Sequence, residues 1–108
     1  MTEIGTLPPK LMKKGVKERL LKICQANNIC FMAMFGSFVT GRENKKSDVD
    51  IAIEFTENSH KSLIDLVHIE NELKKIFRRK VDLGIFSTIS PYIIEDVKKE
   101  MLVIYEKR

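Results

Sequence analysis

Residues 36–55 read GSFVTGRENKKSDVDIAIEF, and the last eight of them decide the fold. From Asp48 to Phe55, polar and apolar residues alternate strictly, which is the pattern of a β-strand with one buried face. Four apolar side chains form the predicted core face: Val49, Ile51, Ile53 and Phe55. The opposite face begins with two neighbouring carboxylates, those of Asp48 and Asp50.

These two carboxylates need a counter-charge. At about 4 Å they repel each other by roughly 4 kcal/mol if the effective dielectric constant is about 20. Mg²⁺ removes this repulsion, and it is commonly bound by one or two carboxylates together with the phosphates of a substrate. Gly36 and Ser37 follow an apolar run, residues 30–35, and open a short segment of modest helical potential. Glycine allows a phosphate to approach the backbone, and a helix N-terminus offers free N–H groups, so the stretch predicts a site for a metal and a phosphorylated ligand.

A third aspartate follows on a later predicted strand. Residues 80–86 alternate again, with Val81, Leu83 and Ile85 on the apolar side. Asp82 and Gly84 lie on the other side. If this strand lies beside the Asp48 strand, Asp82 joins the first two carboxylates and Gly84 leaves room for a ligand. The pattern alone allows equally well a solvent-facing aspartate on a half-exposed sheet.

At these residues the chain resembles the minimal nucleotidyltransferases of the DNA polymerase β superfamily. The resemblance consists of Gly-Ser, a short spacer with Gly41, and Ser-Asp-x-Asp followed by apolar alternation. It extends to Lys80-Val81-Asp82-Leu83, to Ser90-Pro91-Tyr92 and to Val103-Ile104-Tyr105-Glu106, and covers about residues 15–106. It implies an α/β (α+β) fold in which helices flank a small mixed β-sheet, as in the palm of polymerase β.

The resemblance also implies roles for individual residues. The catalytic residues and ligands of one or two Mg²⁺ ions are expected to be Asp48, Asp50 and Asp82. The nucleotide, expected to be ATP, is bound by Gly36, Ser37, Arg42 and Ser47. The implied reaction transfers AMP to a hydroxyl group and releases pyrophosphate.

One departure from the family concerns the phosphate contacts. Many members carry arginine near the positions of Phe38 and Thr40, where it reaches the phosphates. Arg42, Lys45 and Lys46 are the nearby cations that can take its place.

The expected acceptor is another macromolecule, because 108 residues leave no room for the helical domain that builds a small-molecule pocket. The resemblance implies a HEPN-type helical toxin, whose tyrosine receives AMP and which is thereby silenced, so the protein acts as the antitoxin. A first alternative is a module that neutralises its partner by binding alone. A second is a nucleic-acid-binding protein, which the net charge of +4 allows, although few aromatic residues are interleaved with the basic ones.

Composition sets the remaining expectations. A chain of 108 residues predicts a single domain, 1–108, with residues 1–9 as a loose arm. No apolar run approaches the roughly 20 residues that span a bilayer, so we expect a cytoplasmic protein without membrane contact. Cys24 and Cys30 do not form a disulfide pattern and are expected to be reduced and buried.

Helical and strand periodicities alternate along the chain. They predict helices over about 10–26, 37–42, 62–79 and 92–100, and strands over 30–35, 48–55, 80–86 and 101–105. Ser62 and Asp65 have the spacing of a capping box at the start of the third helix. Its predicted apolar stripe consists of Leu63, Leu66, Val67, Leu73, Ile76 and Phe77.

Overall fold

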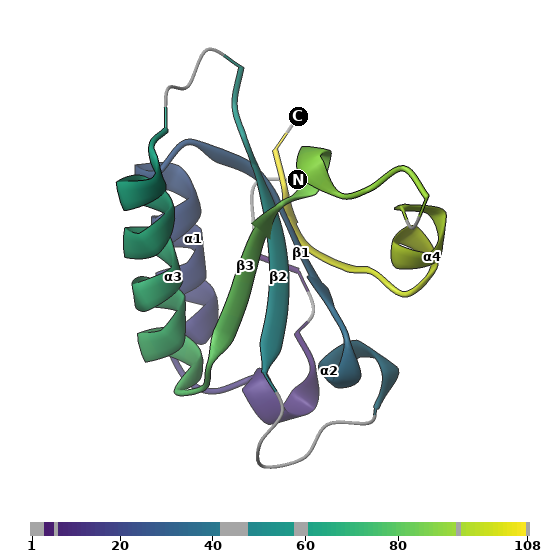
Figure 1. Cartoon of the computed structure of the whole chain (residues 1–108). Helices are drawn as coiled ribbons and strands as arrows, with labels where there is room; N and C mark the ends of the chain where they lie inside the picture. The colour runs from purple at the N-terminus through teal and green to yellow at the C-terminus, as the bar shows by residue number, and fades with distance from the viewer. Residues whose placement is uncertain (1–3, 6, 42–47, 58–60, 93, 108) are drawn as a thin grey trace.

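A four-stranded mixed β-sheet forms the centre of the molecule, with the strand order β3-β2-β1-β4 (Figure 1). The strands are β1 (Ile29–Phe35), β2 (Val49–Phe55), β3 (Val81–Ile85) and β4 (Leu102–Glu106). β1 pairs antiparallel with β2 and β4, whereas β2 and β3 run parallel. The structure is a computed structural model that describes residues 4–5, 7–41, 48–57, 61–92 and 94–107. The expected mixed sheet flanked by helices is confirmed.

The helices cover the two faces of this sheet unequally (Figure 1). Two longer helices, α1 (Val16–Ala26) and α3 (Leu63–Phe77), lie side by side on one face. The other side carries α4 (Ile94–Lys99) and the 3₁₀ turn η2 (Phe86–Thr88). The short α2 (Ser37–Thr40) follows β1, and a second 3₁₀ turn, η1 (Pro9–Leu11), precedes α1.

The predicted core face of β2 is buried beneath α1 and α3. Val49 and Ile53 are fully buried and Ile51 is nearly so, while Phe55 is half-buried and packs against the same cluster. The strict alternation of this strand therefore identified its buried side correctly.

The N-terminal segment differs from the expected loose arm. Ile4 and Leu7 are buried in the core cluster. The backbone N–H of Gly5 donates to the carbonyl of Ile104 at 2.7 Å, which attaches this segment to β4. Ile4, Leu7 and Leu11 have the i, i+3, i+7 spacing of a helical face, but the segment with the two adjacent prolines forms only a 3₁₀ turn, so helical spacing does not explain their burial.

The first helix begins later than predicted. α1 starts at Val16 and not near Lys10, because Gly15 adopts a left-handed conformation (φ 82°) that interrupts the helix. Upstream of this glycine, Pro9 to Leu11 form only a 3₁₀ turn.

The start of α3 is confirmed, but its buried stripe is partly wrong. The Ser62 N–H and hydroxyl donate to Asp65, and the Asp65 N–H donates back to the hydroxyl of Ser62, which completes the capping box. Leu63 and Val67 are 79% and 54% exposed, whereas Ile69 is fully buried. At about 100° per residue, Val67 lies roughly 160° around the helix from Ile69 and therefore faces solvent.

α3 is also the longest of the described helices, with 15 residues. None of the helices in the described ranges is long and apolar enough to cross a membrane.

Both cysteines are free thiols, as expected. Burial raises the pKa of Cys24 to about 12, so this thiol stays protonated at neutral pH. Cys30 is only half-buried.

Candidate active site

Strand pairing brings two of the three aspartates together. Asp50 on β2 lies opposite Phe35 on β1 and beside Asp82 on β3. Residues paired in this way project from the same face of a sheet. This face, which we call the cleft face, is the one that α1 and α3 do not cover. The parallel register of β2 and β3 thus meets the condition under which the sequence predicts that Asp82 joins the other carboxylates.

The carboxylates influence one another electrostatically at Asp50. Its pKa is raised, first by partial burial and then by the negative charges of Asp82 and Asp48. Asp48 itself is exposed just before β2, and Asp82 is exposed on β3. Positive charge is therefore favoured at this point of the cleft face.

Gly36 presses the backbone against the same carboxylate. It lies in the turn between β1 and α2 with a φ of 79°, a conformation that favours glycine. A Cβ atom at this position would collide with Oδ2 of Asp50. Its carbonyl accepts a hydrogen bond from the N–H of Val39 at 3.0 Å, which starts α2. Glycine is required here both for its conformation and for the close approach.

A cavity of about 480 Å³ opens beside this pair, which is within the usual range of roughly 300–1,000 Å³ for ligand pockets. Its lining combines Gly36, Asp50 and Asp82 with the apolar side chains of Phe35 and Ile89. The site is therefore acidic at the paired strands and apolar around them.

The floor of the cavity consists of small residues. Ala52 and Gly84 line it and lie side by side in the β2–β3 register. A Cβ on Gly84 would meet nothing within 4 Å, so a ligand can approach the sheet closely here, as the sequence predicted.

Two contacts hold η2 over the cleft face. The Ser87 hydroxyl donates to Oε1 of Glu54 at 3.1 Å, and the rings of Phe31 and Phe86 lie 5.0 Å apart. The chain that leaves η2 brings Ile89 to the cavity. Sequence reasoning missed Ile89, and no periodic signal marks it. It also missed Phe35, although this residue directly precedes the glycine turn.

The comparison with protein families agrees with this geometry. Residues 18–108 match the polymerase beta nucleotidyltransferase family. The chain belongs to this family. The resemblance seen in the sequence is thereby confirmed, and the chain is a nucleotidyltransferase.

Two relatives of this nucleotidyltransferase carry names of activities. The protein adenylyltransferase MntA of Thermococcus cleftensis is 32% identical over 92 residues, covering 85% of this chain and 84% of that protein. A relative from Methanocaldococcus jannaschii, named as a candidate protein adenylyltransferase, is 29% identical over 85 residues, covering 79% of this chain and 89% of that protein.

Solved structures share the fold. A candidate minimal nucleotidyltransferase superposes with a TM-score of 0.66 at 25% identity, covering 79% of this chain and 85% of that one. A toxin–antitoxin structure with AMP-PNP gives a TM-score of 0.68 at 19% identity, covering 84% of this chain and 73% of that one. The second likeness is one of fold alone.

The remaining predicted nucleotide-binding residues of this nucleotidyltransferase are placed only in part. Ser37 begins α2 directly after Gly36. Arg42 and Ser47 lie outside the described residues, as do Lys45 and Lys46.

The predicted metal ligands fit a magnesium ion by their chemistry. Carboxylate oxygens are the ligands that Mg²⁺ prefers, and the negative charges of Asp48 and Asp82 act on Asp50. The side chains that the structure describes contain no cluster of three or more His, Cys, Asp or Glu residues arranged to hold a metal. The three aspartates thus have oxygen donors and negative charge of the kind that Mg²⁺ prefers, but their side chains are not gathered into such a cluster in this structure.

Phe38, which stands where many family members carry arginine, is a core residue. It is 4% exposed, and the guanidinium of Arg79 lies 4.9 Å from the centre of its ring. An arginine, Arg79, thus contacts α2, but it comes from the segment before β3 and not from position 38 itself.

Proposed function

We propose that this nucleotidyltransferase transfers AMP from ATP to a tyrosine hydroxyl of a HEPN-type toxin and acts as its antitoxin. The observation that carries the proposal is the arrangement of Gly36, Asp50 and Asp82, in which a glycine turn contacts one of two paired acids beside a ligand-sized cavity. The names of the relatives, protein adenylyltransferases, and of the structural neighbours, toxin–antitoxin complexes, support the acceptor class.

The donor is held at the turn between β1 and α2. Gly36 and Ser37 bind the β- and γ-phosphates of ATP through backbone N–H groups and the serine hydroxyl, with Arg42 and Ser47 as further contacts. The absence of a side chain at Gly36 makes room for the carboxylate of Asp50, which lies directly against the proposed phosphate-binding turn.

The three aspartates would hold one or two Mg²⁺ ions, which when bound neutralise the negative charge of the phosphates during displacement. Asp48 and Asp50 are the primary ligands in this proposal. Asp82 either completes the metal site or orients the acceptor.

The reaction is an in-line displacement at the α-phosphorus. The tyrosine oxygen forms a bond to this phosphorus, the bond to the oxygen that bridges to the β-phosphorus breaks, and pyrophosphate leaves. The hydroxyl proton goes to the carboxylate of Asp82 when that residue acts as base. Asp82 is exposed beside Asp50, so an acceptor can reach it from solvent.

The test measures the intact mass of the toxin encoded beside this protein after incubation with ATP, Mg²⁺ and the protein. A gain of one or more AMP units is expected, and it should disappear with Asp48→Asn. Asp48 is exposed and lies outside the core, so this variant should fold normally, which a melting curve checks.

A second function is neutralisation by binding alone. The buried Phe38 favours it, because a cation that many relatives place on the phosphates is missing at this position. A stable complex with unchanged toxin mass, unaffected by Asp48→Asn, would establish this function instead. Steeply salt-dependent binding to RNA or DNA would contradict both.

A further inference from the structure

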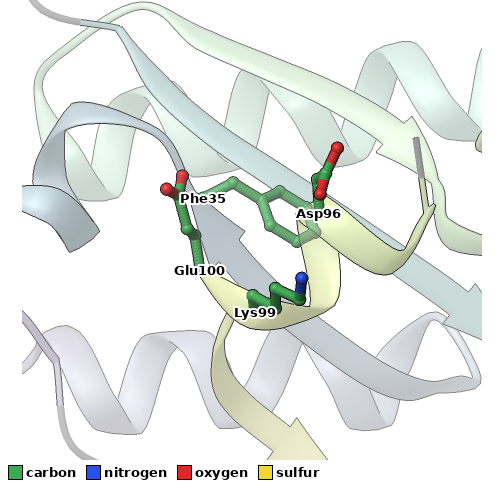
Figure 2. A pocket seen from close by; sticks show the side chains of 4 residues that line it. All are labelled: Phe35, Asp96, Lys99 and Glu100. Carbon is green, nitrogen blue, oxygen red and sulfur yellow. The ribbon is translucent and has the colours of Figure 1, made fainter.

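A second cavity adjoins the candidate active site. It measures about 290 Å³ and lies where the end of β1 meets α4, lined by Phe35, Asp96, Lys99 and Glu100 (Figure 2). Phe35 also lines the larger cavity beside Asp50 and Asp82. One aromatic ring therefore forms a wall of both spaces.

Phe35 lies between the proposed phosphate turn and the second cavity. It is half-buried and directly precedes Gly36, the residue of the proposed phosphate turn. The proposed chemistry gives its ring no role. Aromatic rings at such partly open positions commonly stack on nucleobases, whose flat faces they match.

The other lining residues offer both kinds of hydrogen-bonding group. Asp96 and Glu100 carry acceptor oxygens, and Lys99 carries an ammonium donor. Figure 2 shows the three side chains around the Phe35 ring, all coming from α4 or the residue that follows it. Within the described part of the chain, none of the three forms an ion pair, so their polar atoms are not occupied by one another.

We infer that this second cavity holds the nucleobase of the donor, a purine stacked on Phe35. The polar edge of a purine presents donors and acceptors together, and it meets the carboxylates of Asp96 and Glu100 and the ammonium of Lys99. The inference rests on the proposed function, because the phosphates at Gly36 place the base nearby. The acceptor then approaches the Asp82 side of Phe35, and the base lies on the α4 side.

The test compares two probes, ATP and inorganic tripolyphosphate, whose binding is measured by titration calorimetry with Mg²⁺. Phe35→Leu keeps an apolar side chain but removes the ring face. It should weaken ATP binding about tenfold, the usual scale for loss of base stacking, and leave tripolyphosphate binding unchanged. Phe35→Tyr should restore ATP binding.

A matched control is available on the same strand. Phe31 lies on the same face of β1, also half-buried, but its ring packs on Phe86 and does not line either cavity. Phe31→Leu loosens the contact that holds η2 but removes no wall of the second cavity, so it should not weaken ATP binding relative to tripolyphosphate binding. Any loss of stability that it shares with Phe35→Leu is thereby separated from base binding.

The proposed hydrogen bonds to the edge of the purine are tested by measuring which nucleotide the protein prefers. Lys99→Gln and Glu100→Gln should reduce the preference for ATP over CTP without changing tripolyphosphate binding. Lys98→Gln, an exposed neighbour on α4 that does not line the cavity, serves as the control.

Three results would overturn the inference. Equal weakening of ATP and tripolyphosphate by Phe35→Leu would assign the ring to the phosphate turn or to the fold. If Phe35→Leu left ATP binding unchanged and weakened toxin binding, the second cavity would bind the acceptor and not the nucleobase. Failure of the unaltered protein to bind either probe would refute the proposed function itself, and the inference with it.

Discussion

The two faces of β2 are built from alternate residues of one strand, yet they follow opposite rules. Toward α1 and α3 the strand presents Val49, Ile51 and Ile53, all buried in a continuous core. Toward the cleft it presents Asp50, half-buried among like charges, and the small Ala52. Packing selects the first set, since large apolar side chains fill space there. The second set leaves space in the cleft and places like charges close together, which disfavours the charged form of Asp50.

The core face should respond most strongly when side-chain volume is removed. Ile53→Ala leaves a cavity at a fully buried position and should lower the free energy of unfolding by about 2–5 kcal/mol. Urea unfolding followed by circular dichroism measures this change. A loss below about 1 kcal/mol would mean that the core under β2 collapses around the gap.

Gly36→Ala should break the cleft face by adding volume. Alanine is strained in the left-handed backbone conformation of this position, and its methyl group also collides with Oδ2 of Asp50. Gly41→Ala is the matched control, because Gly41 has a φ of 80° and open space around the position of a Cβ. The control should cost about 1–2 kcal/mol in unfolding free energy. Gly36→Ala should cost more and also abolish ATP binding, and equal losses in the two variants would contradict the collision.

Ser62→Ala tests how much the cap of α3 contributes to stability, since α3 is one of the two helices that cover the core face of the sheet. The expected loss is about 1 kcal/mol at neutral pH. The pKa of Asp65 is lowered by hydrogen bonds from the N–H and then the hydroxyl of Ser62. A carboxyl whose pKa is lower in the folded than in the unfolded state stabilises the fold at pH values above its unfolded pKa. This contribution is lost as the pH falls through the folded-state pKa. The difference between wild type and Ser62→Ala should therefore shrink in acid, and an unchanged difference between pH values of about 7 and 3 would contradict this.

Asp50 is the position where we expect a substitution to change stability least and activity most. Asp50→Asn removes a charge that burial and the carboxylates of Asp82 and Asp48 disfavour. Its free energy of unfolding should change by less than about 1 kcal/mol, with an increase more expected than a decrease. AMP transfer should fall by more than about 100-fold, since even indirect partners of a metal ligand contribute 10–100-fold. A marked loss of stability together with activity would place Asp50 in the fold and not in the site.

What the sequence reveals about this fold follows from the same contrast between faces. Period-two alternation fixes which side of β2 and β3 is buried, so the buried face and the neighbourhood of Asp50 and Asp82 could both be predicted. The burial of Ile4 and Leu7 could not, because their segment is irregular, and the hydrogen bond from Gly5 to Ile104 joins it to a strand that is far away in sequence.

The residues Ile89 and Phe35, which line the cavities, could not be predicted from the sequence either. Ile89 reaches the cavity because η2 is held by contacts to Glu54 and Phe31, which come from different strands. Such contacts depend on how a connection crosses the sheet, and no local pattern encodes that path. Phe35 looks like any apolar residue of β1 until α4 is seen beside it (Figure 2).

The parallel pairing of β2 and β3 has a consequence for how the protein is made. Two parallel neighbours cannot be joined by a tight turn, so the chain passes through the whole of α3 between Asp50 and Asp82. A growing chain that has completed β2 possesses the glycine turn and two acids but lacks the third. During synthesis the proposed enzyme therefore gains its full set of acids only after the helix that covers the opposite face has been made.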